Sequence, residues 1–204
     1  MNFSIPSIIL KKASSTNDIA MKIEVDYPLF AIISDLQLKG KGRFKDRIWF
    51  SEEKTGLFLS ILINSPDYID TDALSYITKI SALSVIKSLN FITSNKKKFR
   101  LKEPNDIYFE NKKISGVLAE SQTKGESIVK IVAGMGVNLI KPEILPEDII
   151  DKAVYLSELI NIEDFDIIRQ DMANYIITEF IKLFNLIKDK KYLLIDEKFK
   201  EFML

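Results

Sequence analysis

The stretch that most constrains the fold is residues 101–120, where two short apolar runs flank a polar turn at residues 110–113. Short apolar runs separated by turn-forming residues predict a β-hairpin. Polar side chains gather at both ends of this hairpin, namely Lys102, Asn105, Asp106 and Lys113. We expect the hairpin to form one wall of an active site, with the other segments arranged around it.

The remaining segments predict a sheet that helices cover on one face. Apolar runs predict strands over residues 7–13, 29–35, 56–63, 99–101, 114–120 and 127–138. The run at residues 56–63 is apolar on both faces, which is typical of a central strand. Helical spacing of apolar residues predicts helices over residues 71–91, 167–187 and 192–204. The expected fold class is α/β (α+β), with a mixed, largely antiparallel sheet.

Composition narrows the class of protein further. The 204 residues suit one domain, and the 29 basic residues balance the 29 acidic ones. A net charge of zero gives no general attraction to nucleic acid or membranes. No apolar run could span a bilayer, and the first residues lack the features of a signal peptide. We therefore expect a cytoplasmic protein that binds neither DNA nor membranes.

Two residue types are missing from the sequence, cysteine and histidine. Without cysteine there is no thiolate nucleophile and no cysteine-based zinc site. Without histidine, catalysis by a Ser-His-Asp triad is excluded. The chemistry left to Lys, Arg, Asp, Glu, Asn and backbone amides suits the binding and polarisation of phosphates and carboxylates.

Three segments could bind an anion, and each also has a simpler interpretation. Residues 14–18 combine Ser, Thr and Asn ahead of a helical pattern, which predicts a helix N-terminus with free amides; local pattern alone favours a plain cap. Residues 37–49 contain five basic residues, two glycines and the single Trp, and they could equally be a solvated loop; the excess of positive charge favours anion binding. Gly134 and Gly136, inside a predicted strand, indicate the close approach of a ligand or another backbone, although a β-bulge is the simpler explanation.

Taken together, residues 10–140 resemble the catalytic domain of biotin protein ligases. The resemblance rests on short blocks in the family's order: Ser15-Thr16-Asn17, then Gly40-Lys41-Gly42-Arg43 up to Trp49, Lys102-Glu103-Pro104-Asn105-Asp106, residues 113–120 with Lys113, Gly116 and Glu120, and Gly134-Met135-Gly136-Val137-Asn138. It implies the biotin/lipoate ligase fold, similar to class II aminoacyl-tRNA synthetases. It also implies that residues 1–140 bind biotin and ATP, and that residues 141–204 are a helical C-terminal segment of the same domain.

The family's activity has two steps, which are the formation of biotinyl-5'-AMP from biotin and ATP and the transfer of biotin to a lysine of a biotin carboxyl carrier protein. The resemblance implies catalytic roles for Lys113, between the two anions, and for Arg43, on a loop that shields the adenylate. The implied biotin-binding residues are Ser15, Thr16, Asn17, Gln37, Gly40, Lys41, Gly42, Arg43 and Gly116. The implied ATP-binding residues are Arg43, Arg47, Trp49, Lys102, Asn105, Asp106 and Asn138, with Asp106 near Mg²⁺ and Gly136 on the pocket floor.

The sequence departs from the family's pattern in several places. Lys41 stands where the family usually has Arg, no Gly precedes Arg47, and Glu103 replaces the usual Trp. The SH3-like C-terminal domain of the family is expected to be absent, as is an N-terminal helix-turn-helix. Because Lys lacks the bidentate fork of Arg, we expect a weaker grip on phosphate.

The leading hypothesis is a ligase that biotinylates the carrier domain of acetyl-CoA carboxylase, with a homodimer left open. A lipoate or octanoate protein ligase of the same superfamily is an alternative. A non-catalytic homologue that binds biotin or nucleotide is another, motivated by Glu103 and the shortened C-terminus. A local nucleic-acid binder through the basic residues 39–47 and 96–100 is disfavoured by the zero net charge.

Overall fold

The structure is a computed structural model that describes residues 4–42, 48–64 and 73–204. Its main sheet has seven strands in the order β1-β2-β5-β9-β8-β7-β6, and β3 and β4 form a separate pair. The strands are β1 (Ser7–Leu10), β2 (Leu29–Ser34), β3 (Gly40–Lys41), β4 (Ile48–Trp49), β5 (Gly56–Asn64), β6 (Phe99–Lys102), β7 (Asp106–Phe109), β8 (Lys112–Lys124) and β9 (Ser127–Asn138). The helices are α1 (Thr16–Lys22), α2 (Ala73–Ile92), η1 (Leu156–Glu158), α3 (Phe165–Lys188) and α4 (Tyr192–Lys200).

The sheet is mixed and largely antiparallel, as the sequence predicts. Strands β1 and β2 pair in parallel, and the other neighbouring pairs of the main sheet are antiparallel. Strand β5 lies between β2 and β9, and its first eight residues are buried. This placement confirms the prediction that the apolar run at residues 56–63 is a central strand, because a strand covered on both faces carries apolar side chains at consecutive positions.

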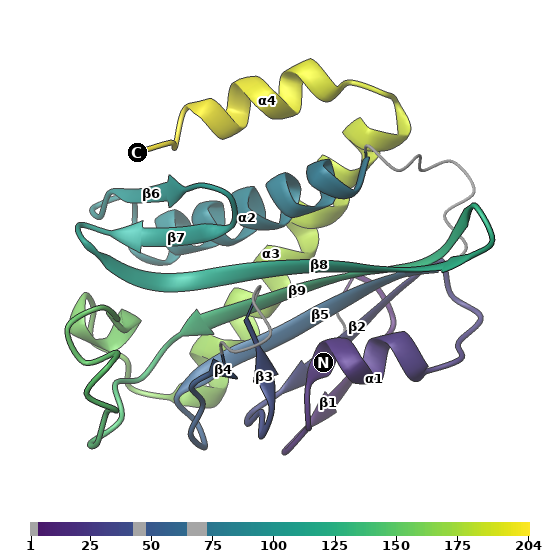
Figure 1. Cartoon of the computed structure of the whole chain (residues 1–204). Helices are drawn as coiled ribbons and strands as arrows, with labels where there is room; N and C mark the ends of the chain where they lie inside the picture. Colours follow the sequence, from purple (N-terminus) through teal and green to yellow (C-terminus); the bar gives the residue numbers. More distant parts are fainter. Residues whose placement is uncertain (1–3, 43–47, 65–72) are drawn as a thin grey trace.

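Helices cover both faces of the sheet, so the prediction of helices on one face alone was wrong (Figure 1). Helices α2 and α3 pack on one face, where Leu59, Ile80 and Phe180 share a large buried core. Helix α1 packs on the opposite face, where Ala20 joins a smaller cluster with Phe30, Ile32, Leu62 and Val132. Successive side chains of a strand point to opposite faces, so β2 and β5 supply both clusters. The face with the smaller cluster is the one that α1 covers, and the first residues of α1 belong to the candidate site.

Two hairpins join β7 to β8 and β8 to β9, and the first lies within residues 101–120, where the sequence predicts a hairpin. Strands β7 and β8 are joined by a turn in which Glu110 has φ 53°, and β8 and β9 by a turn in which Gly125 has φ 61°. Strand β8 pairs with β7 only as far as Gly116 and continues alongside β9 to Lys124, as Figure 1 shows. The outer edge of β6 is covered by the C-terminal residues, because the Leu101 amide donates to the Phe202 carbonyl at 2.7 Å.

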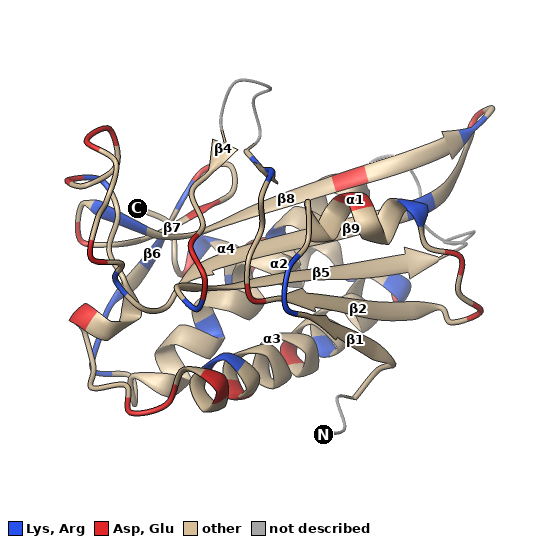
Figure 2. Cartoon of the chain, turned by 90° about the horizontal axis from the view of Figure 1, so that it is seen from below, with Lys and Arg blue, Asp and Glu red and all other residues tan. Residues whose placement is uncertain are grey.

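None of the helices in the described part of the chain combines the length and apolar character needed to cross a bilayer. On the side shown in Figure 2, basic and acidic residues are interspersed along the elements. This pattern agrees with the balanced composition.

Candidate active site

A hollow lies on the α1 side of the sheet, between the start of α1, the β3–β4 pair and the strands β8 and β9. Its lining residues are Ser15, Thr16, Asn17, Gln37, Lys41, Gly42, Trp49, Asn105, Lys113, Gly116, Val117, Leu118, Gly134, Met135 and Gly136. Most of these residues belong to the predicted site, and they come from segments far apart in the chain. Figure 2 shows β4 and α1 over the same side of the sheet.

The N-terminus of α1 forms one wall of the hollow. Ser15 is the N-cap, with φ −154° and ψ 133°, and its hydroxyl accepts a hydrogen bond from the Asp18 amide at 3.4 Å. The plain-cap interpretation is therefore correct for Ser15. Ser15, Thr16 and Asn17 are all buried and all line the hollow, and the side chains of Thr16 and Asn17 also bond to residues outside α1.

A chain of hydrogen bonds connects these two residues to the interior of the sheet. The Thr16 amide donates to Gln37 Oε1 at 2.8 Å. Ser60, on the central strand β5, lies 2.7 Å from Thr16 Oγ1 and 2.6 Å from Asn17 Oδ1. The Asn17 Nδ2 group donates to Glu120 at 2.7 Å and to the Leu118 carbonyl at 3.3 Å. The buried polar groups thus satisfy one another and hold the wall rigid.

The two glycines of β9 make room for side chains above them. Strand β9 keeps a continuous register with β5 through Gly134 and Gly136, so the expectation of a bulge at this point was wrong. A Cβ atom on Gly134 would lie 2.2 Å from Asn17 Oδ1, and one on Gly136 would lie 3.1 Å from the Trp49 ring. The groups that approach these glycines in the structure are side chains, whereas the sequence predicts a ligand or another backbone there.

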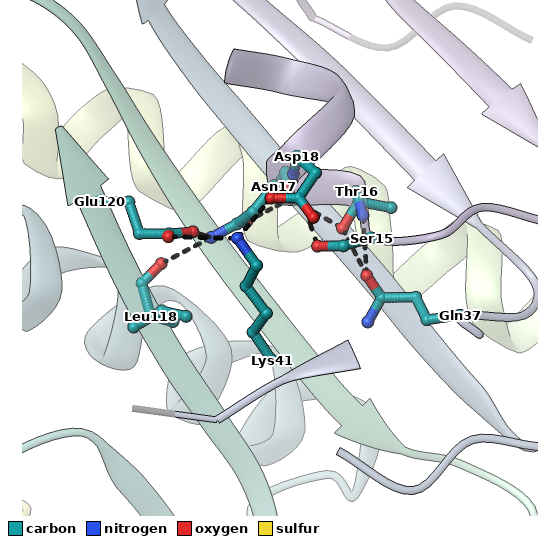
Figure 3. Close-up of polar contacts among 9 residues, drawn as sticks. Ser15, Thr16, Asn17, Asp18, Gln37, Lys41, Leu118 and Glu120 are labelled. Atoms are coloured by element: carbon teal, nitrogen blue, oxygen red, sulfur yellow. Dashed lines mark hydrogen bonds and ion pairs between the residues drawn. The ribbon is translucent and has the colours of Figure 1, made fainter. Parts of the chain in front are cut away.

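Lys41 reaches from β3 over the hollow to α1 and β8 (Figure 3). Its ammonium pairs with Asp18 and lies 3.7 Å from Glu120. The hydrogen bond to Asp18 raises the pKa of Lys41 above its ordinary value, against the opposing effect of partial burial. The lysine therefore stays charged at neutral pH and ties three elements together at the entrance.

Lys113 stands on the opposite wall. Its Nζ atom lies 2.6 Å from Asp106 Oδ1 and 5.2 Å from the centre of the Trp49 ring, a distance that fits a cation–π contact. A Cβ atom on Gly116 would lie 3.0 Å from Lys113 Nζ, so the two residues share one face of β8. A register shift beside Ile107 allows this arrangement, since residues three apart in a regular strand point to opposite faces.

Two asparagines brace the backbone around Lys113. Asn105 Nδ2 donates to the Val117 carbonyl at 2.5 Å. Asn138 Nδ2 donates to the Val154 carbonyl at 3.2 Å and to the Lys113 carbonyl at 3.4 Å. In this structure Asn138 therefore contacts the backbone that carries Lys113, and it does not line the hollow.

A model of the biotin/lipoate A/B protein ligase family matches residues 9–138, which is more than half of the chain. The chain belongs to this family. The match confirms the resemblance that the short sequence blocks indicated, and it covers all of the elements that form the hollow. Helices α3 and α4 lie beyond the matched residues.

Individual relatives agree with the family. The bifunctional ligase/repressor BirA of Bacillus subtilis (strain 168) is 29% identical over 128 residues, which is 62% of this chain and 38% of that protein. The biotin–[acetyl-CoA-carboxylase] ligase of Paracoccus denitrificans is 27% identical over 132 residues, which is 64% of this chain and 53% of that protein. The chain thus spans about two fifths to one half of these curated relatives.

Solved structures support the family and the fold. The biotin protein ligase of Aquifex aeolicus in complex with biotin and ATP has a TM-score of 0.82 and 32% identity, over 98% of this chain and 78% of that chain. The biotin protein ligase of Leishmania major in complex with biotinyl-5-AMP has a TM-score of 0.74 at 20% identity, over 98% of this chain and 81% of that chain. The second likeness supports the fold alone.

Within this family fold, some predicted residues lie away from the hollow or outside the described residues. Lys102 is exposed, with its ammonium 5.1 Å from the centre of the Tyr108 ring. Gly40 and Asp106 do not line the hollow, although Asp106 contacts Lys113. Arg43 and Arg47 lie outside the described residues. Their roles, like those of the other predicted site residues, stay predictions.

Sequence reasoning missed three polar residues of the site, Asp18, Ser60 and Glu120. Ser60 had a visible signal, because it is a buried hydroxyl within an apolar central strand. Glu120 closes one of the short family blocks, but the resemblance assigns it no role. Asp18 stands in the first turn of α1. Nothing local in the sequence connects these three residues, since they come from three different elements.

Asp106 is the predicted metal ligand, and its carboxylate is paired with Lys113. Among the described residues there is no group of three or more His, Cys, Asp or Glu side chains that could hold a metal. Mg²⁺ in nucleotide sites often takes one or two carboxylates and fills its other positions with phosphate oxygens and water. Asp106 can supply one such carboxylate.

Proposed function

We propose that this chain is the catalytic part of a biotin protein ligase that uses ATP. The observation that carries the proposal is that Lys113 lies on the wall of the same hollow as Thr16, Asn17 and Gln37. A cation on one side and a buried polar network on the other suit a ligand with a carboxylate at one end and a polar ring at the other. Biotin has this form.

The chemistry needs positive charge between two anions. In the first step a biotin carboxylate oxygen attacks the α-phosphorus of ATP, and the bond to the departing pyrophosphate breaks. In the second step the amine of a carrier lysine attacks the acyl carbon, AMP leaves, and the amine loses a proton. Lys113 would stabilise the charge that develops on the phosphate and then on the acyl oxygen.

Asp106 and Trp49 prepare Lys113 for this role. The carboxylate of Asp106 keeps the ammonium in place before the anions bind, and the ring of Trp49 lies against it. Asp106 would also hold the Mg²⁺ that accompanies ATP, which neutralises part of the phosphate charge. The predicted role of Arg43 in retaining the adenylate adds to this arrangement.

The polar network favours biotin over lipoate. Thr16, Asn17 and Ser60 are all buried, and they are hydrogen-bonded to one another or to Gln37 and Glu120. A polar wall of this kind can exchange hydrogen bonds with the urea group of biotin, whereas the dithiolane ring of lipoate has no N–H or C=O group to offer. We therefore propose biotin as the acyl substrate and a biotin carboxyl carrier domain, such as that of acetyl-CoA carboxylase, as the acceptor in the cytoplasm.

The test is biotin-dependent exchange of pyrophosphate into ATP, followed by transfer of labelled biotin to a purified carrier domain. We expect exchange with biotin and none with lipoate or octanoate. Exchange with lipoate alone would reassign the substrate. Biotin binding without exchange would instead favour a non-catalytic homologue, which Glu103 motivates.

A further inference from the structure

We infer that Glu120 is a positioning residue that sets the hydrogen-bond polarity of the pocket through Asn17 and Ser60, so that Thr16 presents an acceptor to the ligand. The inference rests on the proposed function for the identity of the ligand. Glu120 does not line the hollow, and it therefore acts through the residues that do. The group that Thr16 would receive is an N–H of the cyclic urea of biotin.

The contacts of the Asn17 side-chain amide fix its orientation. One side of this amide faces Glu120 Oε2 at 2.7 Å and the Leu118 carbonyl at 3.3 Å. A carboxylate and a backbone carbonyl can only accept, so the Asn17 nitrogen must face them. The Asn17 oxygen is then directed to Ser60. Figure 3 shows the contacts from Asn17 to Glu120 and Leu118.

Ser60 has one hydroxyl proton, and the group that receives it determines the neighbouring hydrogen bond. Its hydroxyl is buried and lies 2.6 Å from Asn17 Oδ1 and 2.7 Å from Thr16 Oγ1. The amide oxygen of Asn17 has no proton to give, so Ser60 donates its single proton to Asn17. The contact between Ser60 and Thr16 must then use the proton of Thr16.

Thr16 and Gln37 are left as two acceptors without a proton between them. Thr16 Oγ1 and Gln37 Oε1 are 3.1 Å apart, and the Gln37 oxygen already accepts the Thr16 amide at 2.8 Å. The Thr16 hydroxyl proton is committed to Ser60, where the contact is shorter. The lone pairs of both oxygens are therefore available to one ligand N–H. Thr16 and Gln37 both line the hollow, so a ligand can reach them.

Glu120 makes the shorter of the two contacts that fix the direction of this chain of hydrogen bonds, at 2.7 Å against 3.3 Å for the Leu118 carbonyl. If Glu120 becomes glutamine, its amide can donate to Asn17, which allows the Asn17 amide to turn over. Ser60 then accepts from Asn17 and donates to Thr16, and the Thr16 proton turns to Gln37 Oε1 at 3.1 Å. A ligand N–H would then meet that proton instead of two open lone pairs. We expect Glu120→Gln to weaken biotin binding by roughly tenfold or more.

The experiment uses the full chain and measures binding without ATP, by calorimetry or by the fluorescence of the single Trp. The probes are biotin and its two cyclic carbamate analogues, in which one or the other urea N–H is replaced by oxygen. We expect the wild type to prefer biotin over one analogue by roughly tenfold or more. Glu120→Gln and Ser60→Ala should reduce that preference to about threefold or less.

Matched variants separate polarity from charge and packing. Glu126→Gln removes an exposed carboxylate in the turn after β8 and does not touch Asn17, so it should keep the preference for biotin. Glu120→Asp should restore part of it. An unchanged preference in Glu120→Gln, with biotin still bound, would overturn the inference while leaving the proposed function intact.

Hydrogen exchange needs no ligand and tests this chain of hydrogen bonds directly. The side-chain amide protons of Asn17 should exchange slowly in the wild type, because both are hydrogen-bonded, and much faster in Glu120→Ala. The exposed Asn111 provides the fast reference. Wild-type exchange at Asn17 as fast as at Asn111 would overturn the inference even if biotin does not bind. Absence of biotin binding with slow exchange would instead count against the proposed function alone.

Discussion

Lys113 Nζ lies 2.6 Å from Asp106 Oδ1, across the pairing of β7 and β8. The lysine side chain is 32% exposed and the aspartate side chain 24%, so the pair is partly open to solvent. A partly exposed pair contributes little to stability. Its position beside the hollow therefore points to a role in activity, and the two partners should respond differently to substitution.

Replacing Lys113 with Ala should reduce biotin-dependent pyrophosphate exchange by about a hundredfold or more, because the anions would lose the cation between them. The unfolding free energy should change by less than about 1 kcal/mol, since the ion pair is partly exposed. Lys112→Ala is the matched control, as Lys112 is the exposed neighbour on the same strand. Full exchange activity in Lys113→Ala would show that the assigned role is wrong.

Replacing Asp106 with Asn should raise the Mg²⁺ concentration needed for half-maximal exchange by about tenfold, because one carboxylate ligand is lost. Exchange measured over a Mg²⁺ titration at fixed ATP tests this expectation. Biotin binding without ATP should stay the same. An unchanged Mg²⁺ requirement would remove Asp106 from the proposed metal role.

Gly134 should not tolerate a side chain, because a Cβ atom there would lie 2.2 Å from Asn17 Oδ1. Gly134→Ala should destabilise the protein by about 1–3 kcal/mol through overpacking and should abolish biotin binding. Urea denaturation and calorimetry measure the two effects. Gly125→Asn is the control: Gly125 has φ 61° and open space around its Cβ position, so neither quantity should change much. Normal biotin binding by Gly134→Ala would contradict the packing seen here.

Arg169 of α3 pairs with Asp35, which follows β2 directly and lies two residues before Gln37. Their side chains are 9% and 16% exposed, and burial lowers the pKa of Arg169 from its ordinary value. Arg169→Met would leave Asp35 as an uncompensated charge and should cost about 3–5 kcal/mol.

Urea denaturation measures this loss for Arg169→Met. Adding Asp35→Leu should recover most of it, since no buried charge then remains. Lys191→Ala serves as the control, because its pair with Asp189 is exposed and should contribute about 1 kcal/mol or less. A loss in Arg169→Met no larger than in the control would argue against a buried pair.

The lowered pKa of Glu179 predicts that the unfolding free energy of the protein falls at acid pH. Burial raises the pKa of this carboxyl, but hydrogen bonds from Lys182 and Lys87 outweigh that effect and hold it below its ordinary value of 4.5. A carboxyl with a lowered pKa stabilises the fold above the unfolded-state value, and this stabilisation is lost as the pH falls through the folded-state value. Urea denaturation between pH 7 and pH 3 should show this loss. A slope that is unchanged in Glu179→Gln would contradict the assignment.

Much of the fold follows from local patterns in the sequence. The spacing of apolar residues predicted the helices α2 and α3 and the central strand β5, because local periodicity reflects which side of an element is buried. Ser15 was a recognisable cap for the same reason, since capping involves residues within one turn. The family resemblance also rested on short blocks, each of which keeps its residues close together in the chain.

The tertiary structure decided how those blocks meet. The register shift in β8 puts Lys113 and Gly116 on one face, and no rule of alternation predicts it. Helix α1 packs on the face opposite α2, and this brings Asn17 to Glu120. Hydrogen bonds between residues so distant in sequence depend on strand register and on helix placement. The sequence by itself therefore determined the elements and the family, whereas the polarity of the pocket arises only when β5, β8 and α1 pack together.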